Sequence, residues 1–98
     1  AFGDCAVTGN VTALRNALGR AEPVLRRAYL ENATRSPQIP AEPGIVPALL
    51  DRVRPVHEVV PIDLYLPGCP PSADLIFYTL SELVAGRRPD LSERLRYG

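Results

Sequence analysis

The sequence contains no lysine, only one histidine and only two cysteines among its 98 residues. Its eleven basic residues are all arginines, and eleven acidic residues bring the net charge to zero. The charges are mixed along the chain. There is no basic stripe of the kind that binds nucleic acid and no polybasic segment of the kind that binds anionic lipid. We therefore expect no nucleic acid partner.

Long apolar runs are absent as well, because no stretch approaches the roughly 20 residues that span a membrane. The first ten residues, "AFGDCAVTGN", lack the basic region and apolar core of a signal peptide. We expect a cytoplasmic protein without a membrane partner. A chain of 98 residues allows one small domain. Ala1-Phe2-Gly3 reads as the end of an element, which predicts that a strand is missing upstream.

Proline, in contrast, is abundant. Nine of the eleven prolines fall between Pro37 and Pro71, so this stretch cannot be regular helix or central strand for long. The segment Thr34–Gly44 is expected to be a stiff, extended loop. Residues Ile45–Arg52 are expected to form a helical turn or two.

Two helices are predicted before the proline-rich stretch. The first covers Asn10–Leu18, where Asn10 can cap the helix and Gly19 can end it. The second begins near Glu22, with proline in its first turn, and stops near Asn32. The expected apolar faces are Val11, Leu14 and Leu18 in the first helix, and Val24, Leu25, Ala28 and Tyr29 in the second.

A strand is predicted near the end of the proline-rich stretch, and a third helix is predicted after it. Ile62–Leu66 alternates apolar and polar residues, as a strand does. Ser72 can cap a helix that ends at Gly86, and a short turn over Asp90–Leu95 follows. The expected apolar stripe of this helix is Ile76, Leu80, Leu83 and Val84.

The two cysteines, Cys5 and Cys69, lie in similar surroundings, "GDCAVTGN" and "PGCPPSAD". Each sits between a strand-like run and the start of a helix. Open α/β sheets bind ligands at such places, and helix starts favour the thiolate. Three interpretations stay open at this point: a disulfide, two inert core thiols, or ligands of a shared metal. A metal would need two more ligands from outside the chain, because iron–sulfur and structural zinc sites take four.

The segments "GDCAVTGN" and "PIDLYLPGCPPSADLIFYTLSELVAG", in this order, resemble the small subunit of [NiFe] hydrogenases of the cytoplasmic NAD-reducing type. The iron–sulfur subunit of respiratory complex I has a similar "PGCPP" turn. It usually carries a basic residue after the second proline, where this chain has Ser72. The hydrogenase branch is therefore favoured.

The resemblance implies an α/β fold in which residues 1–98 are a single partial domain. This would be the C-terminal half of a flavodoxin-like domain, helix-rich with few strands and a proline-rich loop. In that family four cysteines bind the proximal [4Fe–4S] cluster. Two of them correspond to Cys5 and Cys69, and the other two form an upstream C-x-x-C that has no counterpart here. The cluster's surroundings would include Gly68, Pro70, Thr8, Gly9 and Asn10, although plain helix capping is an equal alternative for Thr8 and Asn10.

The function implied is electron transfer, because hydrogen is split at the nickel–iron site of a partner large subunit. Electrons would pass through the [4Fe–4S] cluster to diaphorase subunits, where FMN reduces NAD. The partners would be the large subunit, the diaphorase subunits and the missing N-terminal half. The alternatives are a complex I-like or other hydrogenase subunit with a quinone or ferredoxin partner, and a non-redox interaction domain.

The remaining candidates are given structural roles. His57 is expected to be a surface or capping residue. Asp63 and Asp74 have no partner at a spacing that indicates acid–base catalysis, so they are interpreted as turn and helix-dipole residues. Aromatic residues could lie over a flavin, although packing roles are favoured for Tyr65 and Phe77. The aromatic set is Tyr65, Phe77 and Tyr78.

Overall fold

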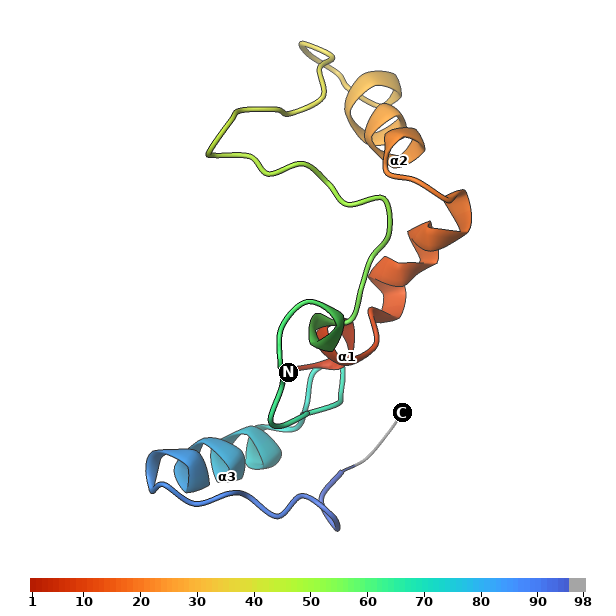
Figure 1. Cartoon of the computed structure of the whole chain (residues 1–98). Helices are drawn as coiled ribbons and strands as arrows, with labels where there is room; N and C mark the ends of the chain where they lie inside the picture. Colours follow the sequence, from red (N-terminus) through yellow and green to blue (C-terminus); the bar gives the residue numbers. More distant parts are fainter. Residues whose placement is uncertain (96–98) are drawn as a thin grey trace. The chain divides into compact units, whose positions relative to one another are not determined.

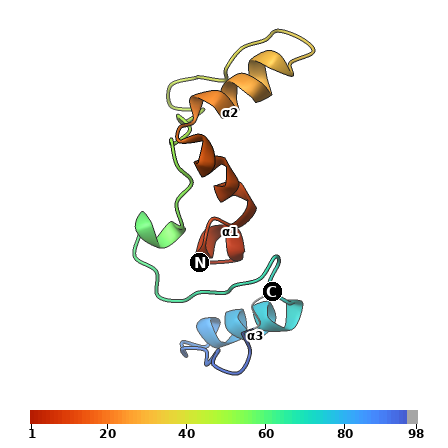
Figure 2. The same cartoon turned by 90° about the vertical axis from the view of Figure 1, so that its right-hand side faces the viewer.

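The structure is a computed structural model, and it describes residues 1–95 of the chain. These residues form two compact units, one of Ala1–Val11 with the chain from Arg54 onward and one of Thr12–Val53. Helical elements separated by long loops dominate both units (Figures 1 and 2), which confirms the helix-rich prediction. The elements are α1 (Asp4–Val7), η1 (Asn10–Leu18), α2 (Glu22–Arg26), η2 (Arg27–Glu31), η3 (Val56–Glu58) and α3 (Ala73–Val84).

In the first unit, the amino-terminal residues run parallel to the segment before Cys69. Phe2 and Leu66 form a parallel bridge. The Ala1 nitrogen donates to the Leu64 carbonyl at 2.7 Å, and the Leu66 N–H donates to the Ala1 carbonyl at 2.8 Å. The Gly3 N–H donates to the Leu66 carbonyl at 2.7 Å. These bonds are the pattern of a parallel β-pair, the arrangement found in α/β proteins.

The strand predicted over Ile62–Leu66 is present only as this isolated bridge. The predicted alternation is confirmed, because Asp63 and Tyr65 are exposed while their apolar neighbours are half-buried or buried. Among the described residues only the first three of the chain pair with this segment, so the ladder is short. The flanking residues Pro61 and Pro67 also have no N–H to donate.

Helix α3 follows the second cysteine and begins as predicted. The Ser72 side chain accepts a hydrogen bond from the Leu75 N–H at 3.3 Å, so it caps the helix. The helix ends at Val84, and Gly86 follows with φ of 74°. The core of this unit is small: Leu66, Leu75 and Leu91 are buried, with Leu64, Tyr78 and Leu95 packed against them.

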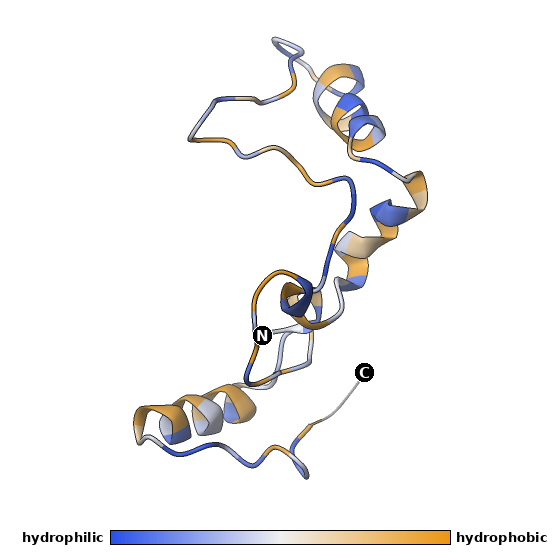
Figure 3. Cartoon of the chain, viewed as in Figure 1, coloured by the Kyte–Doolittle hydropathy of each residue, from blue (hydrophilic) through white to orange (hydrophobic). Residues whose placement is uncertain are grey.

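The apolar stripe predicted for α3 does not face this core, and of its four residues Ile76 alone is half-buried. The inner face carries Leu75, Tyr78 and Thr79, and the opposite face is exposed. The helix is apolar on both sides, and periodicity alone cannot choose which side the chain itself covers. Figure 3 shows the apolar colouring along α3. The exposed fractions on the outer face are 76% for Phe77, 56% for Leu80, 50% for Leu83 and 90% for Val84.

Thr79 is the one buried polar residue of this face, with 2% of its surface exposed. Its hydroxyl finds no hydrogen-bond partner among the described residues. A buried, unsatisfied hydroxyl costs about 1–3 kcal/mol. We therefore expect Thr79→Val, which keeps the shape of the side chain, to raise the free energy of unfolding by about 1 kcal/mol. Thr79→Ser keeps the hydroxyl and should not stabilise the protein. Urea unfolding of the three proteins measures the difference, and a destabilised valine variant would contradict this account.

The two helices predicted before the proline-rich stretch are present with their expected limits; the first begins in the first unit and continues into the second. Asn10–Leu18 is helical, although as a 3-10 helix, and Gly19 follows it with φ of 78°. The next helix begins at Glu22 as α2 and continues as the π-helix η2, whose C-cap is Asn32. The expected apolar faces are largely exposed, among them Val11, Leu14, Leu18 and Tyr29.

The helical turn predicted over residues 45–52 is absent, so that prediction was wrong. Pro47 has no N–H and restricts the residue before it to extended conformations. The segment is extended and is held by side chains from η1. Arg15 donates to the Leu50 carbonyl at 2.7 Å, and Asn16 exchanges two hydrogen bonds with the backbone of Val53 at 2.7 and 3.0 Å. Long-range polar contacts of this kind are not visible in the local sequence.

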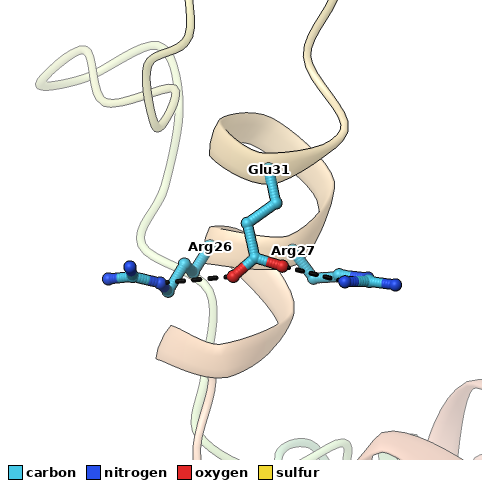
Figure 4. A network of polar contacts seen from close by, with 3 residues as sticks. All are labelled: Arg26, Arg27 and Glu31. Atoms are coloured by element: carbon cyan, nitrogen blue, oxygen red, sulfur yellow. Dashed lines mark hydrogen bonds and ion pairs between the residues drawn. The ribbon is translucent and has the colours of Figure 1, made fainter.

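A small ion-pair network lies at the C-terminal end of η2. Glu31 accepts hydrogen bonds from Arg27 at 3.0 Å and from Arg26 at 3.3 Å (Figure 4). The hydrogen bond from Arg27 is the largest cause that lowers the pKa of Glu31, followed by Arg26 among the lowering causes. The pair therefore stabilises the fold above the unfolded pKa of Glu31, and this contribution is lost as the pH falls through the lowered pKa.

Candidate metal centre

Both cysteines are exposed and carry free thiols. Cys5 is the second residue of the short helix α1, and Cys69 lies between Gly68 and Pro70 in the loop ahead of α3. The interpretation as inert core thiols is therefore wrong, because a packing thiol would be buried. The chain instead presents two accessible thiols.

The loops that carry the two cysteines both follow the parallel β-pair, so they leave it at the same end. Cys5 comes two residues after Gly3, and Cys69 comes three residues after Leu66. The Gly3 N–H donates to the Leu66 carbonyl at 2.7 Å, so the two chains leave the pair in the same direction. Loops at the carboxyl ends of neighbouring parallel strands are where α/β folds place their ligands. The sequence prediction that both cysteines follow strand-like segments is consistent with this arrangement.

The two loops are also tied directly to each other by Asp4. Its carboxylate oxygen Oδ1 accepts a hydrogen bond from the Gly68 N–H at 2.6 Å, and its own N–H donates to the Gly68 carbonyl at 2.9 Å. Asp4 immediately precedes Cys5, and Gly68 immediately precedes Cys69. Asp4 was not among the residues predicted from the sequence. The available signal was a short carboxylate side chain next to a cysteine, because aspartate often bonds to backbone N–H groups in turns.

Gly68 has a backbone that no other residue fits. Its φ is +132°, and an added Cβ would lie 2.6 Å from Pro71 Cα and 2.7 Å from Pro71 N. Both atoms belong to the backbone, so they cannot move aside as a flexible side chain would. The following Cys69–Pro70 peptide bond is cis. The close approach of Gly68 to the Pro71 backbone shows that the loop that carries Cys69 folds tightly at this point.

The loop that follows Cys5 is held by local hydrogen bonds at Thr8, Gly9 and Asn10. Thr8 is the C-cap of α1: its hydroxyl donates to the Asp4 carbonyl at 3.0 Å and accepts from the Asn10 N–H at 3.2 Å. The buried Gly9 has φ of 89°, and its N–H donates to the Cys5 carbonyl at 3.1 Å. The structure thus gives Thr8 the capping role that stood as the alternative in the sequence-based prediction.

Cys69 lines an open pocket of about 600 Å³ beside α3. Glu93 and Arg94 contribute to the same pocket from the C-terminal turn. The Arg94 guanidinium lies 4.1 Å from the ring centroid of Tyr78, a cation–π contact that fixes its place. Arg94 was not predicted either, because it lies 25 positions beyond Cys69 and only the fold brings it to the same pocket.

The other predicted candidates are surface or structural residues, although Asp74 lines the same pocket as Cys69. His57 is exposed, as predicted, and its ring meets Tyr65 edge-on at 6.0 Å. Phe77 is exposed, so the packing role expected for it is not met by the described residues. Asp74 lies in the first turn of α3, as predicted. The Asp63 carbonyl accepts a hydrogen bond from Arg88 at 3.3 Å.

The two cysteines could supply half of the four ligands of a cysteine-bound iron–sulfur cluster. Two exposed thiols on adjacent loops supply two of the four thiolates that such a cluster uses. Among residues 1–95, no three His, Cys, Asp or Glu side chains gather closely enough to hold a metal ion. A complete site would therefore take its remaining ligands from outside this chain. No helix in the same range is both long and apolar enough to cross a membrane.

Comparison with known proteins identifies the class. Residues 1–83 match the family described as "NADH ubiquinone oxidoreductase, 20 Kd subunit", and the chain belongs to this family. The delta subunit of the NAD-reducing hydrogenase HoxS of Cupriavidus necator is 44% identical over 93 residues, which cover 91% of this chain. A subunit of the F420-non-reducing hydrogenase of Methanothermobacter thermautotrophicus is 35% identical over 94% of the chain.

A solved structure agrees with these relatives. The crystal structure of an NAD+-reducing [NiFe]-hydrogenase in the H2-reduced state contains a chain that matches with a TM-score of 0.81 and 40% identity. The match covers 100% of the present chain and 56% of the other. The present chain spans 44% of the Cupriavidus subunit and 30% of the Methanothermobacter subunit. The similarity therefore concerns one part of a longer subunit in each case.

Proposed function

We propose that this chain is the C-terminal half of a flavodoxin-like domain that holds the proximal [4Fe–4S] cluster of a [NiFe] hydrogenase. The single observation that carries the proposal is the pair of exposed, free thiols on two loops that are hydrogen-bonded to each other. Family membership supports it, because the matched relatives include subunits of two named hydrogenases. The non-redox alternative offers no reason for two exposed cysteines to lie on loops that are hydrogen-bonded to each other.

In this function Cys5 and Cys69 act as thiolate ligands, and the other two thiolates come from outside the chain. When bound, a [4Fe–4S] cluster accepts and releases one electron at a time. Gly68 allows the tight turn before Cys69, and Pro70 fixes the backbone after it. The backbone around Thr8, Gly9 and Asn10 holds the Cys5 loop closed.

The proposed partners are those implied by the resemblance to NAD-reducing hydrogenases, and one matched relative is a subunit of such an enzyme. They are a large subunit with a nickel–iron site, diaphorase subunits with FMN that reduce NAD, and the remaining half of the small-subunit domain. The proposed location is the cytoplasm.

A second candidate is a hydrogenase that uses another electron acceptor. It is favoured by the 35% identity to the F420-non-reducing hydrogenase subunit, over 94% of this chain. The two candidates differ in a simple assay, in which the purified complex receives hydrogen and either NAD or a ferredoxin. We expect NAD reduction, and reduction of ferredoxin alone would favour the second candidate.

The outer face of α3 is proposed to pack against the remaining half of the domain. This face, defined by Phe77, Leu80, Leu83 and Val84, is apolar and exposed. Relatives more than twice as long as the matched segment carry further chain that can cover it. A helix apolar on both faces is normally buried on both.

This proposal predicts the effect of a charge on that face. Leu80→Asp should reduce the yield of assembled complex at least about tenfold, because it places a charge in an apolar interface. Ser81→Asp is the matched control, since it adds the same charge at the neighbouring exposed polar position. Co-purification of the tagged chain with its partners measures both. Equal yields for the two variants would contradict the proposed contact.

The proposed electron-transfer role is tested on the assembled complex by electron paramagnetic resonance at low temperature. We expect hydrogen to produce the signal of a reduced [4Fe–4S] cluster in an amount that matches the amount of this chain. A complex that contains the chain but neither iron nor acid-labile sulfide in proportion to it would overturn the proposal.

A further inference from the structure

We infer that Asp4 is a positioning residue that places Cys5 and Cys69 relative to each other before a metal is bound. This inference rests on the proposed function, because it concerns the two ligands named there. It adds a residue to the site that carries no sulfur and that binds no metal itself. Three features of Asp4 support this role: its carboxylate bonds to the other loop, it makes two hydrogen bonds to Gly68, and both residues precede a cysteine.

The Asp4 side chain bonds to the other loop and not to its own helix. Asp4 begins α1, where an acidic side chain commonly accepts from the N–H groups of the first turn. Here the N-cap position is Gly3, which has no side chain, and no side-chain cap bond is made at this end. The Asp4 carboxylate instead accepts from the Gly68 N–H at 2.6 Å, 64 positions away in the sequence.

The contact has two bonds that run in opposite directions. The Asp4 N–H donates to the Gly68 carbonyl at 2.9 Å while the carboxylate accepts from the Gly68 N–H. A single hydrogen bond allows the two loops to rotate about it, whereas two bonds to the same residue fix the orientation as well as the distance. A charged acceptor also makes the stronger kind of hydrogen bond.

The two joined residues are the immediate neighbours of the two ligands. Asp4 precedes Cys5 and Gly68 precedes Cys69, so one peptide unit separates each end of the contact from a ligand residue. The Cys69 loop cannot adjust freely on its side, because Gly68 is already packed against the backbone of Pro71. Fixing Asp4 against Gly68 therefore fixes both cysteine backbones together. Residues that orient ligands in this way typically change metal affinity or activity by about 10- to 100-fold when they are replaced.

The test compares three variants in the assembled complex. Asp4→Ala removes the carboxylate bond. Asp4→Asn removes the charge but keeps an Oδ1 that can accept from Gly68. Asp51→Ala is the matched control, because the Asp51 Oδ1 accepts from the backbone N–H of Ala21 at 3.0 Å in the other unit. Two quantities are measured: amide hydrogen exchange at Gly68 in the cluster-free complex, and the rate at which the loaded complex loses iron to a chelator.

We expect Asp4→Ala to expose the Gly68 N–H to exchange and to lose iron about 10- to 100-fold faster than the wild type. Asp4→Asn should restore both values to within a few-fold, and Asp51→Ala should change neither. Iron loss and Gly68 exchange that stay unchanged in Asp4→Ala would overturn the inference. If the alanine variant does not assemble, Asp4→Glu takes its place, because one added methylene displaces the carboxylate. An unchanged glutamate variant would overturn the inference in the same way.

Failure of this inference and failure of the proposed function give different results. If Cys5→Ser and Cys69→Ser leave the iron content unchanged, the proposed function is wrong, whatever Asp4 does. If both serine variants lose iron while Asp4→Ala behaves as the wild type, the proposed function stands and the role of Asp4 is wrong.

Discussion

Replacing Cys69 with serine should abolish the iron–sulfur cluster of the assembled complex and lower hydrogen-dependent NAD reduction by more than about 100-fold. The expectation exceeds the roughly 10- to 100-fold effect typical of residues that only support a ligand, because a ligand itself is removed. Cys69 is exposed, so its replacement leaves the small core of Leu66, Leu75 and Leu91 intact. Iron and acid-labile sulfide per complex, together with the activity, measure the effect.

Cys5→Ser should have the same effect, and the double variant provides the control. Ligands of one cluster act as a unit, so their individual losses are not additive. We expect the Cys5→Ser/Cys69→Ser variant to be no worse than either single variant. If the activity losses of the two single variants multiplied in the double variant, the cysteines would serve separate sites. This result would contradict a shared cluster.

Replacing Gly68 with alanine should destabilise the protein more than the same replacement at Gly3, Gly19, Gly44 or Gly86. The φ of +132° is costly for a residue with a side chain, by about 1–3 kcal/mol. The added Cβ would also meet Pro71 Cα at 2.6 Å, and overpacking adds about 1–3 kcal/mol. We expect a total loss of about 3 kcal/mol in the free energy of unfolding, measured by urea denaturation of the complex-bound subunit.

Gly44→Ala separates the two causes of this loss. Gly44 also has a positive φ, of +80°, but nothing lies within 4 Å of an added Cβ. It should therefore cost only the backbone term, about 1 kcal/mol. If Gly68→Ala were no more destabilising than Gly44→Ala, the close approach of Gly68 to Pro71 would not matter for stability.

Local signals were sufficient where one residue decides the local structure. The cap at Ser72, the stop after Leu18 and the start at Glu22 were all predicted, because caps, glycines and prolines act over a few positions. The proline-rich stretch was correctly expected to contain little regular structure. The 3-10 and π character of η1 and η2 was not predicted, since these forms have no distinct sequence pattern.

Features that depend on distant segments were predicted poorly. The strand over Ile62–Leu66 has the right alternation, but the extent of pairing depends on what lies beside it, and the first three residues alone pair with it here. The predicted stripe of α3 does not show which side the chain itself covers, because both faces are apolar. The turn over residues 45–52 failed because Arg15 and Asn16 hold that segment extended from another part of the chain.

The candidate site divides in the same way. Cys5 and Cys69 were singled out by their framing, while their role as ligands and the role of Gly68 came from the family resemblance; they lie on loops that meet. Asp4 and Arg94 were missed, because a carboxylate or guanidinium acquires its role only from what the fold brings next to it. Asp4 bonds across 64 positions to Gly68, and Arg94 reaches the Cys69 pocket by stacking on Tyr78.

The central claim is that Cys5 and Cys69 bind one and the same iron–sulfur cluster. Anomalous diffraction at the iron absorption edge, from crystals of the assembled complex, tests this most directly. We expect one compact peak of iron density within bonding distance of the Cys5 and Cys69 sulfur atoms, with two further thiolates from outside this chain. Iron density that touches only one of the two sulfur atoms, or none between them, would contradict it.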